Sequence, residues 1–424
     1  MPIADHALRY TLANELHARP FPTIEAPAVA AWLAIKAPED AAGRDRQADL
    51  AHLTALLDRH GAAHPQPGAT HWAGTIGRHQ LKWESHTEFV TYTVYGADTG
   101  ARPFDPSGFD PFPDDWLAAA PGVRVTSVLI RIAQCDDGAG IAPPLDDWFV
   151  RESLAVSEVL DGAALIAGDF RIDPAGHMRF ALIARPETGA QRIGRVVQRL
   201  CEIETYKAMS MLGLARARQM SERMGALDRD LTRLIDEMSG GAEAATTLAG
   251  LLQVSAELER MGQGGSFRFG ATAAYEALVL QRIASLREAR WQGKQTFAEF
   301  MARRFDPAMR TVKSTENRLM RMTGAASRAG ELLRTRVDVE RSAQNQKLLE
   351  SMDRRADVQL RLQQTVEGLS VVAISYYAVS LAAYLLAPLA ERLGRDKPAL
   401  TAALVLPVVA AVWLLVRRVR RRLH

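Results

Sequence analysis

The residues best suited to chemistry lie in the segment LKWESHTEF, at positions 81–89. Glu84, His86 and Glu88 alternate along this segment, and alternate residues of a β-strand point to the same face of a sheet. Two carboxylates that flank an imidazole could bind a divalent cation or transfer protons. The alternative is a solvated strand face, on which charged side chains at a spacing of two are common. We treat the three residues as a candidate polar cluster and assign no metal to them.

Two further stretches could contribute to a site. LHARP places His17 and Arg19 beside a proline, where they could contact an anion or a nucleotide, or simply form a structural turn. EIETYKAMSMLGL places Glu204 and Tyr206 on a predicted helix. Glu204 lies one helical turn from Lys207, a spacing more typical of a surface ion pair than of a catalytic site. Both stretches are candidate motifs without an assigned role.

Common signatures of catalysis and cofactor binding are missing. The sequence contains no G-x-x-x-x-G-K-[ST], no G-x-S-x-G and no H-E-x-x-H. Its two cysteines, Cys135 and Cys201, cannot form a disulfide framework and lack the spacing of a metal site. The formal net charge of +3 is too small to indicate nucleic-acid binding. We therefore expect no cofactor, no metal and no nucleic-acid partner, and an enzyme is the less favoured interpretation.

The candidate residues must be positioned by helices and strands, and the distribution of proline divides the chain into two parts that differ in these elements. Of the 20 prolines, only Pro307 lies between Glu187 and Ala387. Proline breaks a helix interior at a cost of about 3 kcal/mol, so the chain after Pro186 is free to be helical. The chain before it indicates a mixed α/β domain. Its predicted elements are strands at 28–37, 81–96 and 123–134, two strands around a DPAG turn at 163–185, a helix at 48–60 and a long loop at 97–122.

Apolar residues after Pro186 recur with the helical period of 3.6. The glycine-containing stretches SGGAEAA and MGQGGSFRFG predict breaks between helices. Asp306 and Pro307 are typical of a helix start, as the N-cap and the first helical residue. A long helix could run from there into the C-terminal region, although Gly324 and Gly330 leave its continuity open.

Two uncharged stretches near the C-terminus predict a transmembrane hairpin. Residues 368–390 and 398–416 carry no charged side chain, and about 20 helical residues cross a bilayer. Only ERLGRDK separates them, so the link is tight. Four Lys and Arg residues at 347–361 and five at 417–422 flank the hairpin, against three in the link. The positive-inside rule therefore predicts that both termini are cytoplasmic, with the lipid bilayer as a partner.

The first of these stretches also carries hydroxyl groups. Ser370, Tyr377, Ser380 and Tyr384 are seven, three and four residues apart and therefore share one helix face. Polar side chains avoid lipid, so this face should meet another helix or water. Contact with another helix is the first interpretation. The lining of a pore or cavity is the second, and it requires an oligomer because two helices cannot enclose a pore.

Four stretches together carry a resemblance to a known family. NELHARPF, LKWESHTEF, RLCEIETYKAMSMLGL and TVEGLSVVAISYY resemble a bacterial family of membrane-anchored proteins of unknown function, number 3422 in the domain-of-unknown-function series. The resemblance is spread over nearly the whole chain. It implies anchorage in the bacterial inner membrane, and it transfers no reaction and no catalytic residue.

The expected architecture is also similar to that of CorA-type magnesium channels. Those channels place a cytoplasmic α/β domain and long helices before a C-terminal two-helix hairpin with a basic tail, and they assemble as pentamers. Their Gly-Met-Asn signature is absent here, and the corresponding stretch reads LLAPLAERLG. The departure argues against magnesium selectivity, and likeness of architecture alone is weak ground for function.

Together these features predict an α+β protein in four parts. The parts are a mixed α/β domain (1–186), a helical bundle with a long stalk-like helix (187–368), two transmembrane helices (369–416) and a basic tail (417–424). The favoured function is a membrane-anchored scaffold or regulatory protein. It is expected to form a homo-oligomer and to contact protein partners in the cytoplasm. The alternative is a homo-oligomeric, CorA-like ion channel or transporter.

Overall fold

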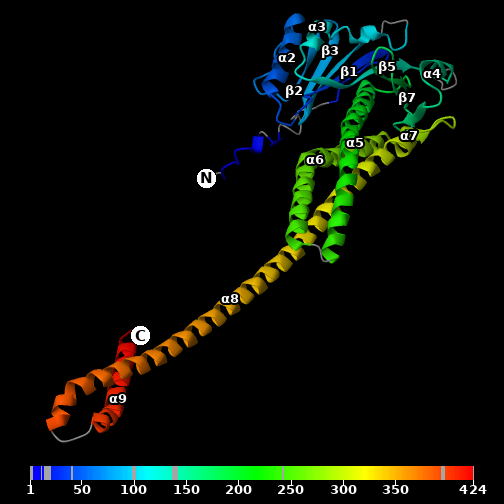
Figure 1. The fold of residues 1–424 in the computed structure, drawn as a ribbon. Helices are drawn as coiled ribbons and strands as arrows, with labels where there is room; N and C mark the ends of the chain where they lie inside the picture. The colour runs from blue at the N-terminus through cyan, green and yellow to red at the C-terminus, as the bar shows by residue number, and fades with distance from the viewer. Residues whose placement is uncertain are drawn as a thin grey trace. The chain divides into compact units, whose positions relative to one another are not determined.

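A computed structural model describes residues 3–10, 12–13, 21–39, 42–97, 102–135, 142–240, 243–392 and 397–423. The fold is α+β, as predicted (Figure 1). Its strands are β1 Ala28–Lys36, β2 His71–Ile76, β3 His79–Ser85, β4 Phe89–Ala97, β5 Val123–Gln134, β6 Ala155–Val159, β7 Ala164–Ile172, β8 Met178–Ala184 and β9 Ala289–Arg290. Its helices are α2 Arg46–Arg59, η1 Pro106–Phe109, α3 Asp114–Ala118, α4 Ala142–Trp148, α5 Ala190–Ser239, α6 Ala244–Leu286, α7 Phe297–Arg304, α8 Asp306–Arg392 and α9 Lys397–Leu423.

The described strands form one sheet in the order β2-β3-β4-β1-β5-β8-β7-β6-β9. β5 and β8 run parallel, and the other neighbouring pairs in this order are antiparallel. The predicted strands at 28–37 and 123–134 correspond to β1 and β5, and the DPAG turn joins β7 to β8 as expected. The predicted helix at 48–60 is α2. The predicted loop at 97–122 contains η1 and α3.

The segment 81–96 is a hairpin, so the prediction of one strand there is wrong. β3 ends at Ser85 and β4 begins at Phe89, and the backbone N–H of His86 donates to the Phe89 carbonyl at 2.8 Å to close the turn. The turn contains no glycine, proline or asparagine, so its sequence gave no turn signal. Glu84, His86 and Glu88 therefore do not occupy successive positions on one strand.

The two faces of the sheet have different coverings. Leu33 and Ile35 of β1 belong to a core with residues of α2 and α3. Trp32 points to the other face, where its indole N–H donates to Thr205 Oγ1 of α5 at 2.9 Å. Because successive side chains of a strand alternate between faces, residues on β1 are separated into two environments. Each environment contains a different candidate site.

Helices α5 and α6 approach closely along their length. A Cβ atom at Gly213 of α5 would lie 2.2 Å from Thr272 Oγ1 of α6, and one at Gly265 of α6 would lie 3.3 Å from Met220 Cε of α5. The break predicted at MGQGGSFRFG is therefore wrong, because α6 continues through it. Each glycine in a helix costs about 1 kcal/mol relative to alanine, and the close packing that it permits offsets this cost. The break predicted at SGGAEAA is confirmed between α5 and α6.

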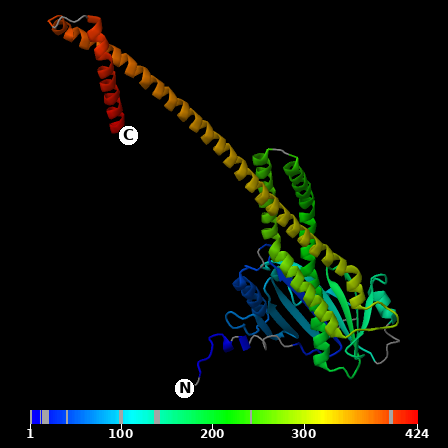
Figure 2. The same cartoon turned by 90° about the horizontal axis from the view of Figure 1, so that it is seen from below.

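Contacts divide the chain into two units, Met1–Gly240 with Ala249–Ala329, and Gly241–Leu248 with Gly330–His424. The predicted domain limits at 186, 368 and 416 stay predictions. In the second unit, α8 passes Gly330 without a break and ends at Arg392, and α9 follows (Figure 2). The stalk-like helix is thus continuous across both glycines in question, since α8 begins at Asp306.

Candidate functional site

The side chain of Glu88 is the centre of a buried charged group on the α5 face of the sheet. It is 1% exposed, its Oε1 accepts a hydrogen bond from Tyr275 Oη at 3.1 Å, and Arg268 of α6 forms an ion pair with its Oε2. Burial, followed by the nearby Glu88 carboxylate, raises the pKa of the Tyr275 phenol. Burial and Arg268 lower the pKa of Lys36, against the opposing effect of Glu88. The Glu88 carboxylate thus pairs with Arg268 of α6 and also acts electrostatically on Lys36 of β1.

Aromatic rings extend this group toward α5. The rings of Tyr206 and Tyr275 stack with centroids 5.7 Å apart, and Phe89 meets Tyr206 edge-on at 6.4 Å. His86 stacks on Phe89 at 4.5 Å. The structure therefore brings His86 and Glu88 of the candidate polar cluster together with Tyr206, which comes from a separate candidate motif.

The other two candidate carboxylates on this face have separate partners. Glu84 lies 3.2 Å from Lys82 Nζ, which also donates to Gln198 Oε1 of α5 at 3.0 Å. Glu204 pairs with Lys207 at 2.6 Å and accepts a hydrogen bond from Thr126 Oγ1 of β5 at 3.3 Å. Both carboxylates are almost fully buried, so the pair expected on the surface is an internal one. His17 and Arg19 lie outside the described residues.

The buried carboxylates between the sheet and helices α5 and α6 are paired with positive charges. Glu84, Glu88 and Glu204 each have a cationic partner within the protein, and buried charges require such partners to be stable. In the described part of the chain, no group of three or more His, Cys, Asp or Glu residues could hold a metal ion. The arrangement joins the sheet to α5 and α6.

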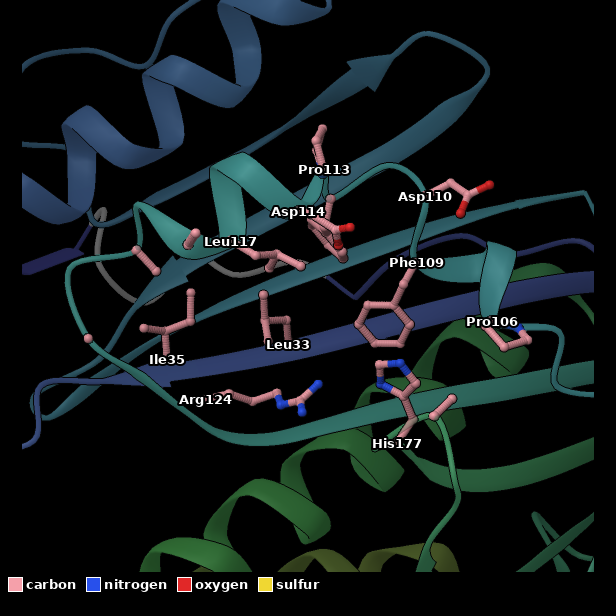
Figure 3. A pocket seen from close by; sticks show the side chains of 15 residues that line it. Leu33, Ile35, Pro106, Phe109, Asp110, Pro113, Asp114, Leu117, Arg124 and His177 are labelled. Carbon is pink, nitrogen blue, oxygen red and sulfur yellow. The ribbon is translucent and has the colours of Figure 1, made fainter.

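An open cavity of about 710 Å³ lies on the opposite face of the sheet (Figure 3). Its floor is apolar and includes Leu33 and Ile35 of β1, while Phe109 of η1 and Leu117 of α3 contribute to its walls. This size is within the range of small-molecule sites, about 300–1,000 Å³. Sequence reasoning missed this site because it treated 97–122 as a loop. The available signal was a proline-rich stretch that also carries aromatic and acidic residues.

His177 is held rigidly at one side of the cavity. Its Nδ1 lies 2.9 Å from Ser127 Oγ, and its ring stacks on Phe109 with centroids 3.8 Å apart and an angle of 14° between the planes. Its backbone N–H donates to Asp173 Oδ1 at 2.8 Å, within the DPAG turn. Burial, followed by the positive charge of Arg124, lowers the pKa of His177. The imidazole is therefore neutral at pH 7.

Arg124 of β5 supplies a positive charge beside His177 (Figure 3). Its guanidinium lies against Gly176, where a Cβ atom would be 3.0 Å from Arg124 Nη2. Gly176 has a φ of +90°, a conformation that favours glycine. Among the described residues, no acidic side chain forms an ion pair with Arg124. The cavity can therefore offer a cation and a neutral imidazole above an apolar floor.

Buried histidines should make the stability of the sheet-containing unit depend on pH. Burial lowers the pKa values of His52 and His177 below the ordinary 6.5. The unfolded chain therefore binds more protons below about pH 6.5, and the free energy of unfolding should fall there by up to about 1.4 kcal/mol per pH unit for each histidine. Chemical denaturation at pH 7.5 and 5.5 measures this. His52→Gln should reduce the dependence, and His71→Gln, at an exposed position, should not. A free energy of unfolding that does not change between these pH values would contradict the expectation.

Comparisons with known proteins identify a family and nothing further. Residues 4–423 match the family described as Protein of unknown function (DUF3422). No curated protein matches, and no solved structure matches. The architectural likeness to CorA-type channels therefore gains no support.

Proposed function

Because this chain belongs to the DUF3422 family, for which no function is known, we propose from its own features that it is a membrane-anchored scaffold or regulatory protein with a large cytoplasmic domain. Two helices are long and apolar enough to cross a membrane. The bilayer that they cross is proposed to be the bacterial inner membrane. The folded domain would then act through contacts with other proteins.

The observation that carries this proposal is the exposure of the apolar side chains on α8 and α9. Only 6% of the most apolar stretch of each helix is buried. Leu385 is 76% exposed and Leu406 is 80% exposed. Exposed apolar surface costs about 25 cal/mol per Å² in water, and a bilayer removes that cost. Soluble core helices, by contrast, are mostly buried.

The pairing of the buried carboxylates supports a scaffold over an enzyme. A general acid or base needs a side chain that can reach a substrate and exchange a proton. Glu84, Glu88 and Glu204 are instead engaged with Lys82, Arg268 and Lys207. Their positions fit a role in joining the sheet to α5 and α6.

A reporter fusion tests the proposed topology. Lys and Arg are more frequent on the flanks of the hairpin than in its link, so the positive-inside rule predicts a cytoplasmic C-terminus. A reporter that is active only in the periplasm should stay silent when it is fused after His424. Activity of that reporter would refute a cytoplasmic C-terminus.

A second candidate, a homo-oligomeric channel or transporter, rests on the hydroxyl-bearing face of α8. Tyr377 and Tyr384 are 67% and 82% exposed in the single chain. Ser375 of α8 and Val412 of α9 are the buried residues among those described within the two spans. In a bilayer, this face would need to contact another helix or water; it carries Ser370, Tyr377, Ser380 and Tyr384. Another copy of the chain could provide the helix, and an oligomer could enclose the water.

Substitution of Tyr377 separates these possibilities. If Tyr377 contacts another helix, Tyr377→Leu should weaken assembly by about 0.6–2 kcal/mol, the range for interhelical hydrogen bonds in membranes. Val379→Leu is the control, because position 379 lies about 160° away around the helix. Native mass measurement of the detergent-solubilised protein gives the oligomeric state. Intact assembly with altered ion flux would favour a channel, and equal behaviour of both variants would leave the tyrosine without a role in assembly.

A further inference from the structure

We propose that the cavity between β1, β5, η1 and α3 binds a small monocarboxylate with an apolar body. The proposal concerns a ligand of the folded domain, and it holds whether or not the domain acts as a scaffold. It rests on three features that point to the same space: an apolar floor, an uncompensated guanidinium and a buried imidazole with one ring nitrogen in use.

The apolar floor sets the body of the ligand. Leu33 and Ile35 lie under the cavity, and Phe109 and Leu117 border it (Figure 3). Leu33 and Ile35 are already buried, at 2% and 4% exposed, so the apolar area that binding removes from water is mainly that of the ligand. An aromatic ring or a short branched chain would gain free energy in proportion to that area. A strongly polar body such as a sugar would lose its hydration here without replacement.

The polar groups set the head of the ligand. Arg124 lines the cavity and has no acidic partner among the described residues. A guanidinium binds a carboxylate through two parallel hydrogen bonds. His177 is 7% exposed, and its Nδ1 lies 2.9 Å from Ser127 Oγ, which orients the ring; the same hydroxyl lies 3.2 Å from the Gly176 carbonyl oxygen, to which it can donate. Its Nε2 has no hydrogen-bond partner in the described part of the chain, so a ligand carboxylate can accept from it when Nε2 carries the proton.

Two acidic residues favour a single negative charge on the ligand. Asp110 and Asp114 line the cavity on the side across from Arg124 and His177 (Figure 3). Two carboxylates and one guanidinium give the lining a negative balance, because His177 is neutral. A phosphate or another dianion would meet this repulsion, whereas a monoanion seated on Arg124 would experience less of it. The charge pattern thus selects a monocarboxylate over a phosphate.

Four probes of similar shape test the proposal with the full-length protein in nanodiscs. They are phenylacetate, 2-phenylethanol, 2-phenylethylamine and phenyl phosphate, and saturation-transfer NMR with titration gives each dissociation constant. We expect phenylacetate to bind most tightly. Arg124→Gln should weaken phenylacetate about tenfold or more, as expected for the loss of charge-assisted hydrogen bonds, and should change 2-phenylethanol little.

Two further variants make the result decisive. Arg218→Gln removes the same charge from an exposed position on α5 outside the cavity and should leave every constant unchanged. Ala118→Trp fills the cavity from an exposed lining position and should weaken phenylacetate and 2-phenylethanol alike. Equal binding of phenylacetate by Arg124→Gln and the unmodified protein would overturn the proposal. Preference for the amine would assign the site to Asp110 and Asp114 instead, and a lack of saturable binding by all four probes would also overturn it.

Discussion

Substitution of both Leu381 and Leu406 by arginine should release the protein from the membrane. These residues are 62% and 80% exposed and lie near the centres of the two apolar stretches. An arginine at the centre of a membrane helix costs about 2.5–3.5 kcal/mol, so the pair should cost about 5–7 kcal/mol. Fractionation followed by alkaline carbonate extraction measures the result. The unmodified protein should resist extraction, and the double variant should be extracted, aggregate or be degraded.

The same substitution elsewhere on α8 provides the control. Leu348 and Leu360 are 62% and 59% exposed, and both precede the apolar stretch. Arginine at these two positions should leave the protein in the membrane fraction, because this part of the helix already carries charged side chains. Equal retention of both double variants would mean that the apolar helices do not span the bilayer, and the anchoring function would fail with them.

Glu88→Gln should lower the free energy of unfolding by about 3–5 kcal/mol, the usual result of removing one partner of a buried ion pair. The substitution preserves shape and removes only the charge. It leaves Arg268 buried without its carboxylate, and it removes the negative charge near Lys36. Denaturation of the detergent-solubilised protein, followed by tryptophan fluorescence, measures the change.

An exposed ion pair provides the matched control for that experiment. Glu257 accepts two hydrogen bonds from Arg223, at 2.5 and 2.7 Å, on the surface of α5 and α6. Glu257→Gln should cost only about 0–1 kcal/mol, because water solvates the arginine that remains. The double change Glu88→Leu with Arg268→Met should recover much of the loss, because it leaves neither charge unpaired. Equal effects of the two glutamine substitutions would show that Glu88 does not carry a buried structural charge.

Local sequence determined many of the elements in this protein. The strand at β5 was predicted from its β-branched residues, the β7–β8 turn from DPAG, and the start of α8 from the Asp306–Pro307 pair. The absence of charge at 368–390 and 398–416 predicted two apolar helices. These predictions succeeded because each depends on residues that are close in the chain and on conformational preferences that those residues carry themselves.

Two predictions from the sequence failed, the break within α6 and the single strand at 81–96. In each, contacts with another helix or strand outweighed the preference of the local residues. The glycines of α6 predicted a break, but contact with α5 keeps the helix continuous. The turn at His86 carries no turn residues, and pairing of β3 with β4 places it there. For α6 the deciding contact comes from a distant helix. For the hairpin it comes from the neighbouring strand, and the residues at the turn carry no signal of it.

Tertiary structure alone decided what the candidate residues face. In the sequence, His86 and Glu88 belong to one candidate cluster and Tyr206 to a separate motif. The fold brings them together near Phe89 and places Arg268, 180 residues from Glu88, against the carboxylate. Arg124 and His177 meet because β5 and β8 pair in parallel, an arrangement that requires a long crossover in the chain. Burial, charge pairing and the cavity are properties of residues from different strands and helices, so the path of the chain had to be known before any of them could be assigned.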